Sequence, residues 1–534
     1  MDSHPVVAYI GQSAWNLIHD KFSDHAKKTL TTLITFVEEE CLPAEALFHA
    51  QVSTDPSKRW ASYPPIIEKL KSRAKALGLW NIWLSKDHYA AQGGFLTNLE
   101  YAVCAEIMGR AIRVAPEACN ASAPDTGNMG AYSSRGRDLP NAMEHETAIL
   151  EVLARYGSPA QQEKWLKPLL EGKTRSSFAM TEKGIASSDA TNIRTSITLD
   201  PKTDEIVING HKWWISGAGD PRNAVHLVLG KSDAGAAKHN QQSIVIVPSN
   251  AKGVKLVRPM QVVRRPSQLS ASPTFRLLSC NRSQLTLYLA QFGYDDAPEG
   301  HYEVLYENVR VPKENLILGW GRGFEIIQGR LGPGRIHHCM RSLGIASRAL
   351  DLALIRATDP NKTTFGKQLY QHGTVIKDLA ESRIELDQAR LLVLGAALMI
   401  DTHPQRAKGA MREIGMSKAS AEQIIVPTVV NRIIDRAMQL HGAEGISRTS
   451  LSRLLPSPVT DIYATNLPPS EDTPLAAMWA GVRTLRYADG PDETHSAALG
   501  KTELKRVPEV RARHERMKKR EETLMKGEKV KAHL

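Results

Sequence analysis

The chain has 534 residues, of which 42% are hydrophobic and 23% are charged, as is usual for a globular protein. This length is too great for one hydrophobic core, so we expect two or three packed units with room for a ligand cleft between them. No apolar run approaches the roughly 18 residues that a membrane-spanning helix needs, so we expect no membrane span.

The formal net charge of +11 raises the question of a nucleic-acid partner. Much of the excess of Lys and Arg lies in residues 501–531, where these residues alternate with Glu as in a solvated helix. No recognition motif accompanies this charge, so we expect no nucleic-acid binding. The five cysteines are scattered without a C-x-x-C pair, which predicts a reducing compartment, no disulfide framework and no metal site.

Both ends of the chain bear on targeting. The N-terminal segment carries Asp2 and Asp20 and lacks the apolar core of a secretory signal. The chain ends in Ala532-His533-Leu534, a small residue, a basic residue and Leu, which is similar to the Ser-Lys-Leu class of peroxisomal address. We therefore expect a peroxisomal protein, with mitochondria and cytoplasm as the alternatives.

The residue patterns change along the chain from helical to β-rich and back to helical. We expect an N-terminal helical domain (1–175), a middle β domain (176–315), a C-terminal helical bundle (316–500) and a charged tail (501–534). The patterns predict helices at 100–109 and 158–170, and strands at 206–208, 225–229, 244–247 and 302–311.

Two apolar stripes at helical spacing predict helices that pack antiparallel in the C-terminal bundle. The first consists of Ile376, Ala380, Ile384, Leu391, Leu394 and Leu398, and the second of Val426, Val430, Ile433, Ala437 and Leu440. Three segments interrupt otherwise continuous motifs, at about 130–150, 264–291 and 448–471. We expect exposed loops there, and a second interpretation is that they are translated intron-like stretches.

Several short segments resemble, in order, those of the acyl-CoA dehydrogenase family. These segments are Phe178-Ala179-Met180-Thr181-Glu182, 186–192, Lys212-Trp213-Trp214-Ile215-Ser216-Gly217, Arg335-Ile336-His337-His338, Gln439-Leu440-His441-Gly442-Ala443 and the turn at 489–493. The resemblance is strongest to the subgroup that is fused to a kinase-like domain in animals, family members 10 and 11, and covers only their dehydrogenase part. It implies an α+β fold with an N-terminal helical domain, a middle β-barrel-like domain and a C-terminal four-helix bundle.

The resemblance also implies an FAD enzyme that desaturates acyl-CoA thioesters to trans-2-enoyl-CoA in fatty-acid β-oxidation. That reaction needs a base for the α-proton and a hydride acceptor facing the β-carbon. Asp489 matches the position of the base, where most members carry Glu, and Asp492 and Glu493 are alternatives. Arg335 matches an Arg behind the base, whereas Gly334 stands where some members place the base instead.

Other positions match the family's cofactor and substrate contacts. Met180 and Thr181 match the segment at the pyrimidine edge of the flavin, and Trp214, Ile215 and Ser216 match the stretch that packs on the ring and places a hydroxyl near N5. Ser188 matches a Ser beside the thioester arm of the substrate.

A last group of positions matches contacts to the FAD of a neighbouring subunit. Gln439, Gly442 and Gly445 resemble the segment at the pyrophosphate, and Phe365 resembles the adenosine contact. Lys362 stands where the family has Arg, and because Lys lacks the bidentate guanidinium we expect weaker retention of FAD.

A shared FAD site implies a homo-oligomer, either a dimer or a tetramer. The expected electron acceptor is an electron-transfer flavoprotein, or oxygen if the chain is a peroxisomal acyl-CoA oxidase. A further alternative is a non-catalytic homologue that holds little flavin.

The glycines at 319, 321 and 323 lack the strand-turn-helix context of a dinucleotide loop, so we expect no nicotinamide cofactor.

Overall fold

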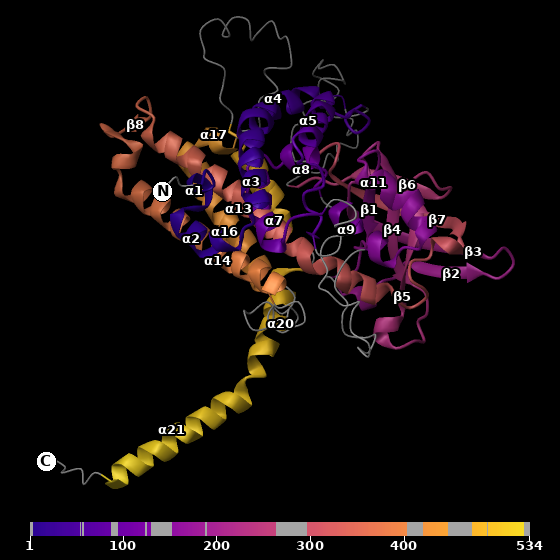
Figure 1. The fold of residues 1–534 in the computed structure, drawn as a ribbon. Coiled ribbons are helices and arrows are strands. Elements are labelled where there is room, and N and C mark those ends of the chain that lie inside the picture. Colours follow the sequence, from indigo (N-terminus) through magenta and orange to yellow (C-terminus); the bar gives the residue numbers. More distant parts are fainter. Residues whose placement is uncertain are drawn as a thin grey trace, which may run out of the picture.

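The computed structural model describes residues 4–53, 55, 58–86, 94–122, 125–129, 152–186, 189–262, 296–402, 420–446, 473–488 and 490–527. At residues 127, 328–335 and 420–424 it describes the backbone alone. Figure 1 shows the N-terminal helices packed against the C-terminal helices, with the β-sheet to one side of both. This is the predicted fold of helical domain, β domain and helical bundle, which is confirmed. The three predicted insertions lie outside the described residues.

The N-terminal part consists of short helices, one of which is completely buried. The helices are α1 (Val7–Ile10), α2 (Gln12–Ile18), α3 (Asp24–Phe36), α4 (Leu42–Gln51), α5 (Pro65–Ala76), α7 (Asn98–Gly109), α8 (Ala115–Ala118), α9 (Asp125–Met129), α10 (Pro159–Gln161) and α11 (Lys167–Leu170). Every residue of α7 is buried, and a capping box between Thr97 and Glu100 fixes where this helix begins. Buried Arg390 binds Glu106 of α7 at 2.8 Å, which ties α7 to the C-terminal bundle.

The middle part is a seven-stranded sheet. Its strands are β1 (Arg175–Ala179), β2 (Ser196–Asp200), β3 (Glu205–Ser216), β4 (Asn223–Lys231), β5 (Gln242–Pro248), β6 (Val254–Pro259) and β7 (His301–Pro312). The order is β1-β4-β2-β3-β7-β6, with β5 on the other edge of β4. β1 runs parallel to β4, whereas β3 pairs antiparallel with both β2 and β7. Each predicted strand lies within one of these strands.

The C-terminal part is helical, with one small hairpin. The elements are α13 (Gly323–Thr358), β8 (Thr363–Thr364), β9 (Lys367–Gln368), α14 (Gly373–Thr402), α16 (Ser420–His441), α17 (Ala443–Ile446), α19 (Leu475–Leu485), α20 (Asp492–Leu504) and α21 (Val507–Gly527). Within the parts of the chain that the structure describes, no helix combines the length and apolarity needed to cross a membrane.

The two predicted apolar stripes have different outcomes. Val426, Val430, Ile433 and Ala437 of α16 are buried in the bundle, as predicted. On α14 the first stripe is buried only in part, because Leu394 lies in the core whereas Ile376, Ile384 and Leu391 are 55%, 56% and 41% exposed. The reason is that α14 has a second apolar face, formed by Leu386, Val393 and Ala397, and this face packs in the core beside Leu394.

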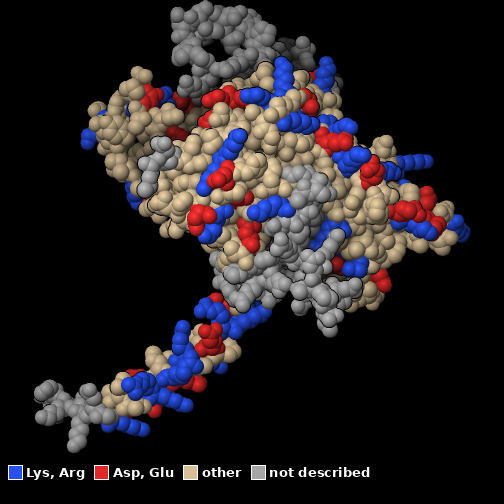
Figure 2. All heavy atoms as spheres, in the orientation of Figure 1, with Lys and Arg blue, Asp and Glu red and all other residues tan. Residues whose placement is uncertain are grey.

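The charged tail forms helix α21, which projects away from the body of the protein (Figure 1). Its side chains are almost all exposed. Figure 2 shows Lys and Arg side chains along its length, with acidic side chains among them. This agrees with the expectation of a solvated helix, because opposite charges one turn apart support a helix without a packed face.

Candidate active site

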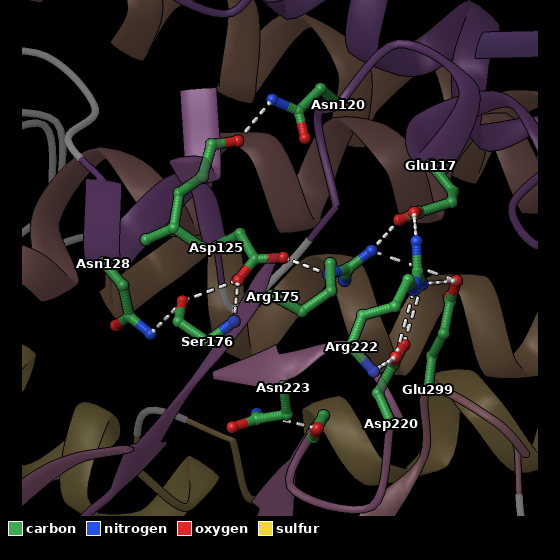
Figure 3. Close-up of polar contacts among 12 residues, drawn as sticks. Glu117, Asn120, Asp125, Asn128, Arg175, Ser176, Asp220, Arg222, Asn223 and Glu299 are labelled. Carbon is green, nitrogen blue, oxygen red and sulfur yellow. Dashed lines mark hydrogen bonds and ion pairs between the residues drawn. The ribbon is translucent and has the colours of Figure 1, made fainter. Parts of the chain in front are cut away.

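Strand β1 is fixed at its first residues by a buried polar network (Figure 3). The Arg175 guanidinium contacts the carboxylates of Glu117 and Asp125. The backbone N–H and the hydroxyl of Ser176 donate to Asp125 at 2.7 and 2.6 Å, and Asn128 donates to the Ser176 hydroxyl at 2.9 Å. Burial raises the pKa of Asp125 to about 7. The network joins the N-terminal helices to the first residues of β1. It therefore fixes the position of the strand that leads to Met180.

A second arginine extends this network to β4, the strand beside β1. Arg222 donates to Glu117 at 2.8 Å and binds Asp220 at 2.8 Å, and its guanidinium lies 3.5 Å from the centre of the Tyr63 ring. Buried charges are stable only when they are paired, and here two arginines share the Glu117 carboxylate. The starts of β1 and β4 are therefore held at fixed positions relative to each other.

The segment Met180–Thr181 follows the last residue of β1 and is held by a buried ion pair. The Lys212 ammonium, fully buried, donates to the Met180 carbonyl at 2.8 Å and to the Glu182 carboxylate at 2.8 Å. Glu182 also accepts the backbone N–H groups of Arg194 and Thr195, at 2.7 and 2.9 Å. Burial lowers the pKa of Lys212 to about 8, and the adjacent Glu182 carboxylate opposes this shift.

The segment Trp214–Ser216 lies next to Met180–Thr181. The Trp213 backbone N–H donates to the Thr181 carbonyl at 3.1 Å, which joins the two segments directly. β3 has one extra residue between Lys212 and Ile215 relative to β7, and Trp214 in this bulge has φ of 55°. A non-glycine residue in the left-handed region costs of order 1–3 kcal/mol, and such strain is concentrated at functional sites.

The bulge decides which side chains of this segment can meet a ligand. Trp214 and Ser216 are partly exposed, whereas the Ile215 side chain is buried in the core of the sheet. A contact from Ile215 to a cofactor would therefore come from its backbone. The Ser216 hydroxyl is 2.8 Å from Nδ1 of His301, the first residue of β7.

The residues predicted to contact the FAD of a neighbouring subunit lie together at the end of the bundle. Phe365 is 95% exposed at the tip of the β8–β9 hairpin, and Gly442, with φ of 64°, ends α16. Lys362 directly precedes the hairpin, and its ammonium is 3.3 Å from the carboxylate of Glu444, two residues after Gly442. Gln439 lines a cavity of about 190 Å³ between α13, α14 and α16.

Figure 1 shows that these residues are far from the sheet. The β8 and α17 labels lie at one end of the molecule, and strands β1 and β3 lie at the other. The predicted flavin residues therefore form two groups, and these groups lie apart from each other within a single chain. We call Met180, Thr181, Trp214, Ile215 and Ser216 the sheet group, and Lys362, Phe365, Gln439 and Gly442 the bundle group.

Three predicted residues are not placed by the structure. Asp489 and Ser188 lie outside the described residues, and Arg335 lies in α13 where the backbone alone is described. The alternative bases are placed: Asp492 opens α20 with its carboxylate 2.6 Å from Arg486, and Glu493 is exposed. An ion-paired carboxylate in the first turn of a helix has a structural role there, which argues against Asp492 as the base.

The sheet group fits a flavin in its chemistry. It offers hydroxyls at Thr181 and Ser216 and an indole face at Trp214. Next to the group, the indole N–H of Trp213 is buried with no acceptor in the described part of the chain. A flavin ring needs donors and acceptors at its edge and an apolar surface on its face. No group of His, Cys, Asp and Glu side chains within the described ranges could hold a metal ion.

The sequence patterns do not reveal the residues that support the sheet group. Lys212 and Glu182 stand inside the matched segments, but nothing in the sequence shows that they form a buried pair. His301 is 85 residues from Ser216 in sequence, so only the pairing of β3 with β7 brings them together.

A separate cavity lies elsewhere on the sheet. A cavity of about 880 Å³ is lined by β2, the β4–β5 connection and the start of α13, and none of the predicted flavin residues lines it. In its wall the His239 ring stacks on Phe324 at 4.2 Å between centroids. Ser216 and His239 are at opposite ends of the sheet, because Ser216 ends β3 near the start of β4 and His239 follows the end of β4.

N-terminal helices, a middle β-sheet and a C-terminal helical domain make up the fold, and comparison with known proteins identifies the family. The profile of the acyl-CoA dehydrogenase middle domain matches residues 177–267, and that of the acyl-CoA dehydrogenase C-terminal domain matches residues 321–504. The chain is 42% identical over 467 residues to the probable acyl-CoA dehydrogenase FadE2 of Mycobacterium tuberculosis, which covers 86% of this chain and 92% of that protein. The chain belongs to the acyl-CoA dehydrogenase family.

Relatives in the predicted subgroup are longer. The chain is 42% identical over 486 residues to acyl-CoA dehydrogenase family member 10 of Mus musculus and 41% identical over 475 residues to family member 11 of Homo sapiens. These alignments cover 90% and 88% of this chain, but only 37% and 49% of those proteins. The predicted resemblance, limited to the dehydrogenase part, is confirmed.

Solved structures agree with this assignment. An acyl-CoA dehydrogenase from Mycobacterium abscessus, described as putative, superposes with a TM-score of 0.70 at 36% identity and covers 91% of this chain and 99% of its own. Butyryl-CoA dehydrogenase from Megasphaera elsdenii, at 20% identity, covers 90% and 99% with a TM-score of 0.61, which shows a shared fold.

Proposed function

We propose that the chain is an FAD-dependent acyl-CoA dehydrogenase that desaturates acyl-CoA to trans-2-enoyl-CoA. FAD, when bound, would supply the acceptor for the hydride that leaves the β-carbon. Asp489 would take the proton from the α-carbon, with Arg335 behind it and Ser188 beside the thioester arm. The backbone of Met180, the hydroxyls of Thr181 and Ser216, and the Trp214 indole would hold the ring.

One observation carries this proposal. The two segments that match the family's flavin contacts, separated by more than thirty residues in sequence, lie side by side and are joined by the bond from the Trp213 N–H to the Thr181 carbonyl at 3.1 Å. The buried Lys212–Glu182 pair fixes the same junction from inside the sheet. A solved relative, glutaryl-CoA dehydrogenase from Mycobacterium smegmatis, is described in complex with FADH2.

The proposal is tested with the purified chain incubated with FAD and freed of excess cofactor. We expect a flavin absorption band that bleaches when acyl-CoAs of increasing length are added without oxygen. Bleaching at one range of lengths would identify the substrate. A protein that stays colourless with added FAD would contradict the proposal and favour the flavin-poor homologue.

The same preparation distinguishes the electron acceptors. We propose an electron-transfer flavoprotein, and one solved neighbour is described as the electron transferring flavoprotein of Acidaminococcus fermentans. Re-oxidation by added electron-transfer flavoprotein, with little hydrogen peroxide, would support this acceptor. Hydrogen peroxide formed in step with substrate in air would instead establish an acyl-CoA oxidase.

We also propose that the active protein is a homo-oligomer. The sheet group and the bundle group are at opposite ends of one chain, so a second copy must bring its bundle group to the sheet group for both to contact one FAD. The exposed stripe of Ile376, Ile384 and Leu391 supports an assembly, because apolar side chains repeated along one helix face are typical of an interface.

Replacing Phe365 with Ser should weaken FAD binding about tenfold without lowering the melting temperature of the FAD-free protein. The side chain is 95% exposed, so its loss should change the stability of its own chain little. The change should matter only if Phe365 contacts FAD that is bound to the sheet group of another copy. Equilibrium titration with FAD measures this, and Tyr370→Ser, also exposed near the hairpin, is the control. Equal FAD affinity in the Phe365 variant would contradict the shared site.

We propose a peroxisomal location on the basis of Ala532-His533-Leu534. A fluorescent protein fused to the N-terminus of the chain should lie in peroxisomes. Deleting the last three residues should release the fusion to the cytoplasm. Unchanged location after the deletion would show that the tripeptide is incidental.

A further inference from the structure

His301 contacts both of the partly exposed side chains that the proposed function places against the flavin ring. It opens β7 directly opposite Ser216, the last residue of β3. Its Nδ1 is 2.8 Å from the Ser216 hydroxyl, and its ring centre is 5.3 Å from that of Trp214, with the two planes tilted by 58°. One imidazole therefore contacts both Ser216, at the end of β3, and Trp214 in the bulge.

The bulge makes this support necessary. Trp214 has a left-handed backbone conformation that a bulky residue adopts only where its surroundings hold it. The Ser216 hydroxyl is a free rotor unless a partner fixes it, and the bond to His301 is its side-chain hydrogen bond in this structure. Without the imidazole, both the indole and the hydroxyl would have more freedom.

The surroundings of His301 favour the neutral imidazole. Burial lowers its pKa, and the nearby Arg113 acts in the same direction, whereas Asp296 opposes it; Arg113 and Asp296 are themselves ion-paired. A neutral imidazole has one donor nitrogen and one acceptor nitrogen. Either Ser216 donates to Nδ1 and presents its lone pairs to a ligand, or Nδ1–H donates to Ser216 and leaves the hydroxyl proton available.

We propose that His301 is a positioning residue that fixes the Ser216 hydroxyl and the Trp214 ring for the flavin. The inference rests on the proposed function, since it assumes that FAD lies against the sheet group. It extends that function by adding a residue from β7, a strand that carries none of the matched flavin motifs. The ligand is the isoalloxazine ring, which has hydrogen-bonding atoms along one edge and an apolar face.

Two variants separate the two contacts of His301. His301→Asn keeps a polar atom near the position of Nδ1 but removes the ring, and His301→Phe keeps an aromatic ring but removes the hydrogen bond. A lost hydrogen bond of ordinary strength corresponds to a change of about threefold to tenfold. We therefore expect His301→Phe to weaken FAD binding about fivefold, and His301→Asn to retain the hydrogen-bond contribution but lose the contribution of the ring.

A double-mutant cycle with Ser216→Ala provides the decisive readout. If His301 acts through the hydroxyl, His301→Phe should weaken FAD binding in the wild-type background and have little further effect in the Ser216→Ala background. The ratio of affinities for oxidised and reduced flavin should shift in the same non-additive way. A tenfold shift in that ratio moves a two-electron midpoint potential by about 30 mV.

His239→Phe is the matched control, because it keeps the stack on Phe324 and lies at the other end of the sheet. It should leave FAD affinity unchanged. The unfolding midpoint of each FAD-free variant shows whether it folds and whether the coupling of Ser216 and His301 exists without the cofactor.

The outcomes are distinguishable. If the wild-type chain binds no FAD, the proposed function fails and this inference fails with it. If the wild-type chain binds FAD and His301→Phe binds it equally well, or if the effects of His301→Phe and Ser216→Ala simply add, the inference alone is overturned. Non-additive loss of FAD affinity with a shifted potential supports it.

Discussion

Replacing Asp489 with Asn should leave FAD bound and slow the reduction of the flavin by acyl-CoA about 100-fold to 10,000-fold. A positioned general base contributes about this much to a proton transfer, and an amide cannot accept the α-proton. The turn that follows is fixed by Gly490, whose φ of 118° is open to few other residues. Stopped-flow absorbance under anaerobic conditions measures the rate.

Two further variants serve as controls for this prediction. Asp492→Asn loses the ion pair with Arg486 at the start of α20, and Glu493→Gln changes an exposed side chain. Both should reduce their flavin at close to the wild-type rate. Full reduction in Asp489→Asn, together with a loss in either control, would move the base to that residue.

Replacing Lys212 with Met should destabilise the fold by about 3–5 kcal/mol and should also weaken FAD binding. The change leaves the buried Glu182 carboxylate without its counter-charge, and removing one partner of a buried ion pair costs about this much. FAD binding falls as well because the Met180 carbonyl loses its bond from Lys212, at 2.8 Å, next to the predicted flavin contact. Chemical denaturation and FAD titration measure the two effects.

A double variant tests whether the unpaired charge causes the loss of stability. Adding Glu182→Gln to Lys212→Met removes the unpaired carboxylate, so the double variant should regain much of the lost stability. Lys167→Met, on an exposed pair with Glu163, should change neither stability nor FAD affinity measurably. A single Lys212→Met variant as stable as the wild type would show that the pair does not hold this junction.

The order of the domains could be predicted from periodicity, because each unit is long and has a clear repeat. The α16 stripe was predicted correctly since Val430 and Ile433 face a single core. The α14 stripe was correct at Leu394 but not along its whole length, because this helix has two apolar faces and the sequence does not show which face packs within the chain. Ile384 and Leu391 belong to the face that stays exposed.

The candidate site could be predicted only as far as local motifs reach. Met180 and Trp214 stand in short continuous segments, so resemblance identified them. His301 acts across a strand pairing, and Lys212 acts through burial, which depends on how the whole sheet folds. Neither relation leaves a pattern in the local sequence. The separation of the sheet group from the bundle group likewise appears only in three dimensions.

The most direct test of the account is a single turnover of the FAD-loaded protein with acyl-CoA and no electron acceptor, followed by mass spectrometry of the thioester. The account predicts one molecule of a product lighter than the substrate by two hydrogens for each flavin that bleaches. Bleaching without this product, or unchanged acyl-CoA beside a flavin that stays oxidised at every chain length, would contradict it.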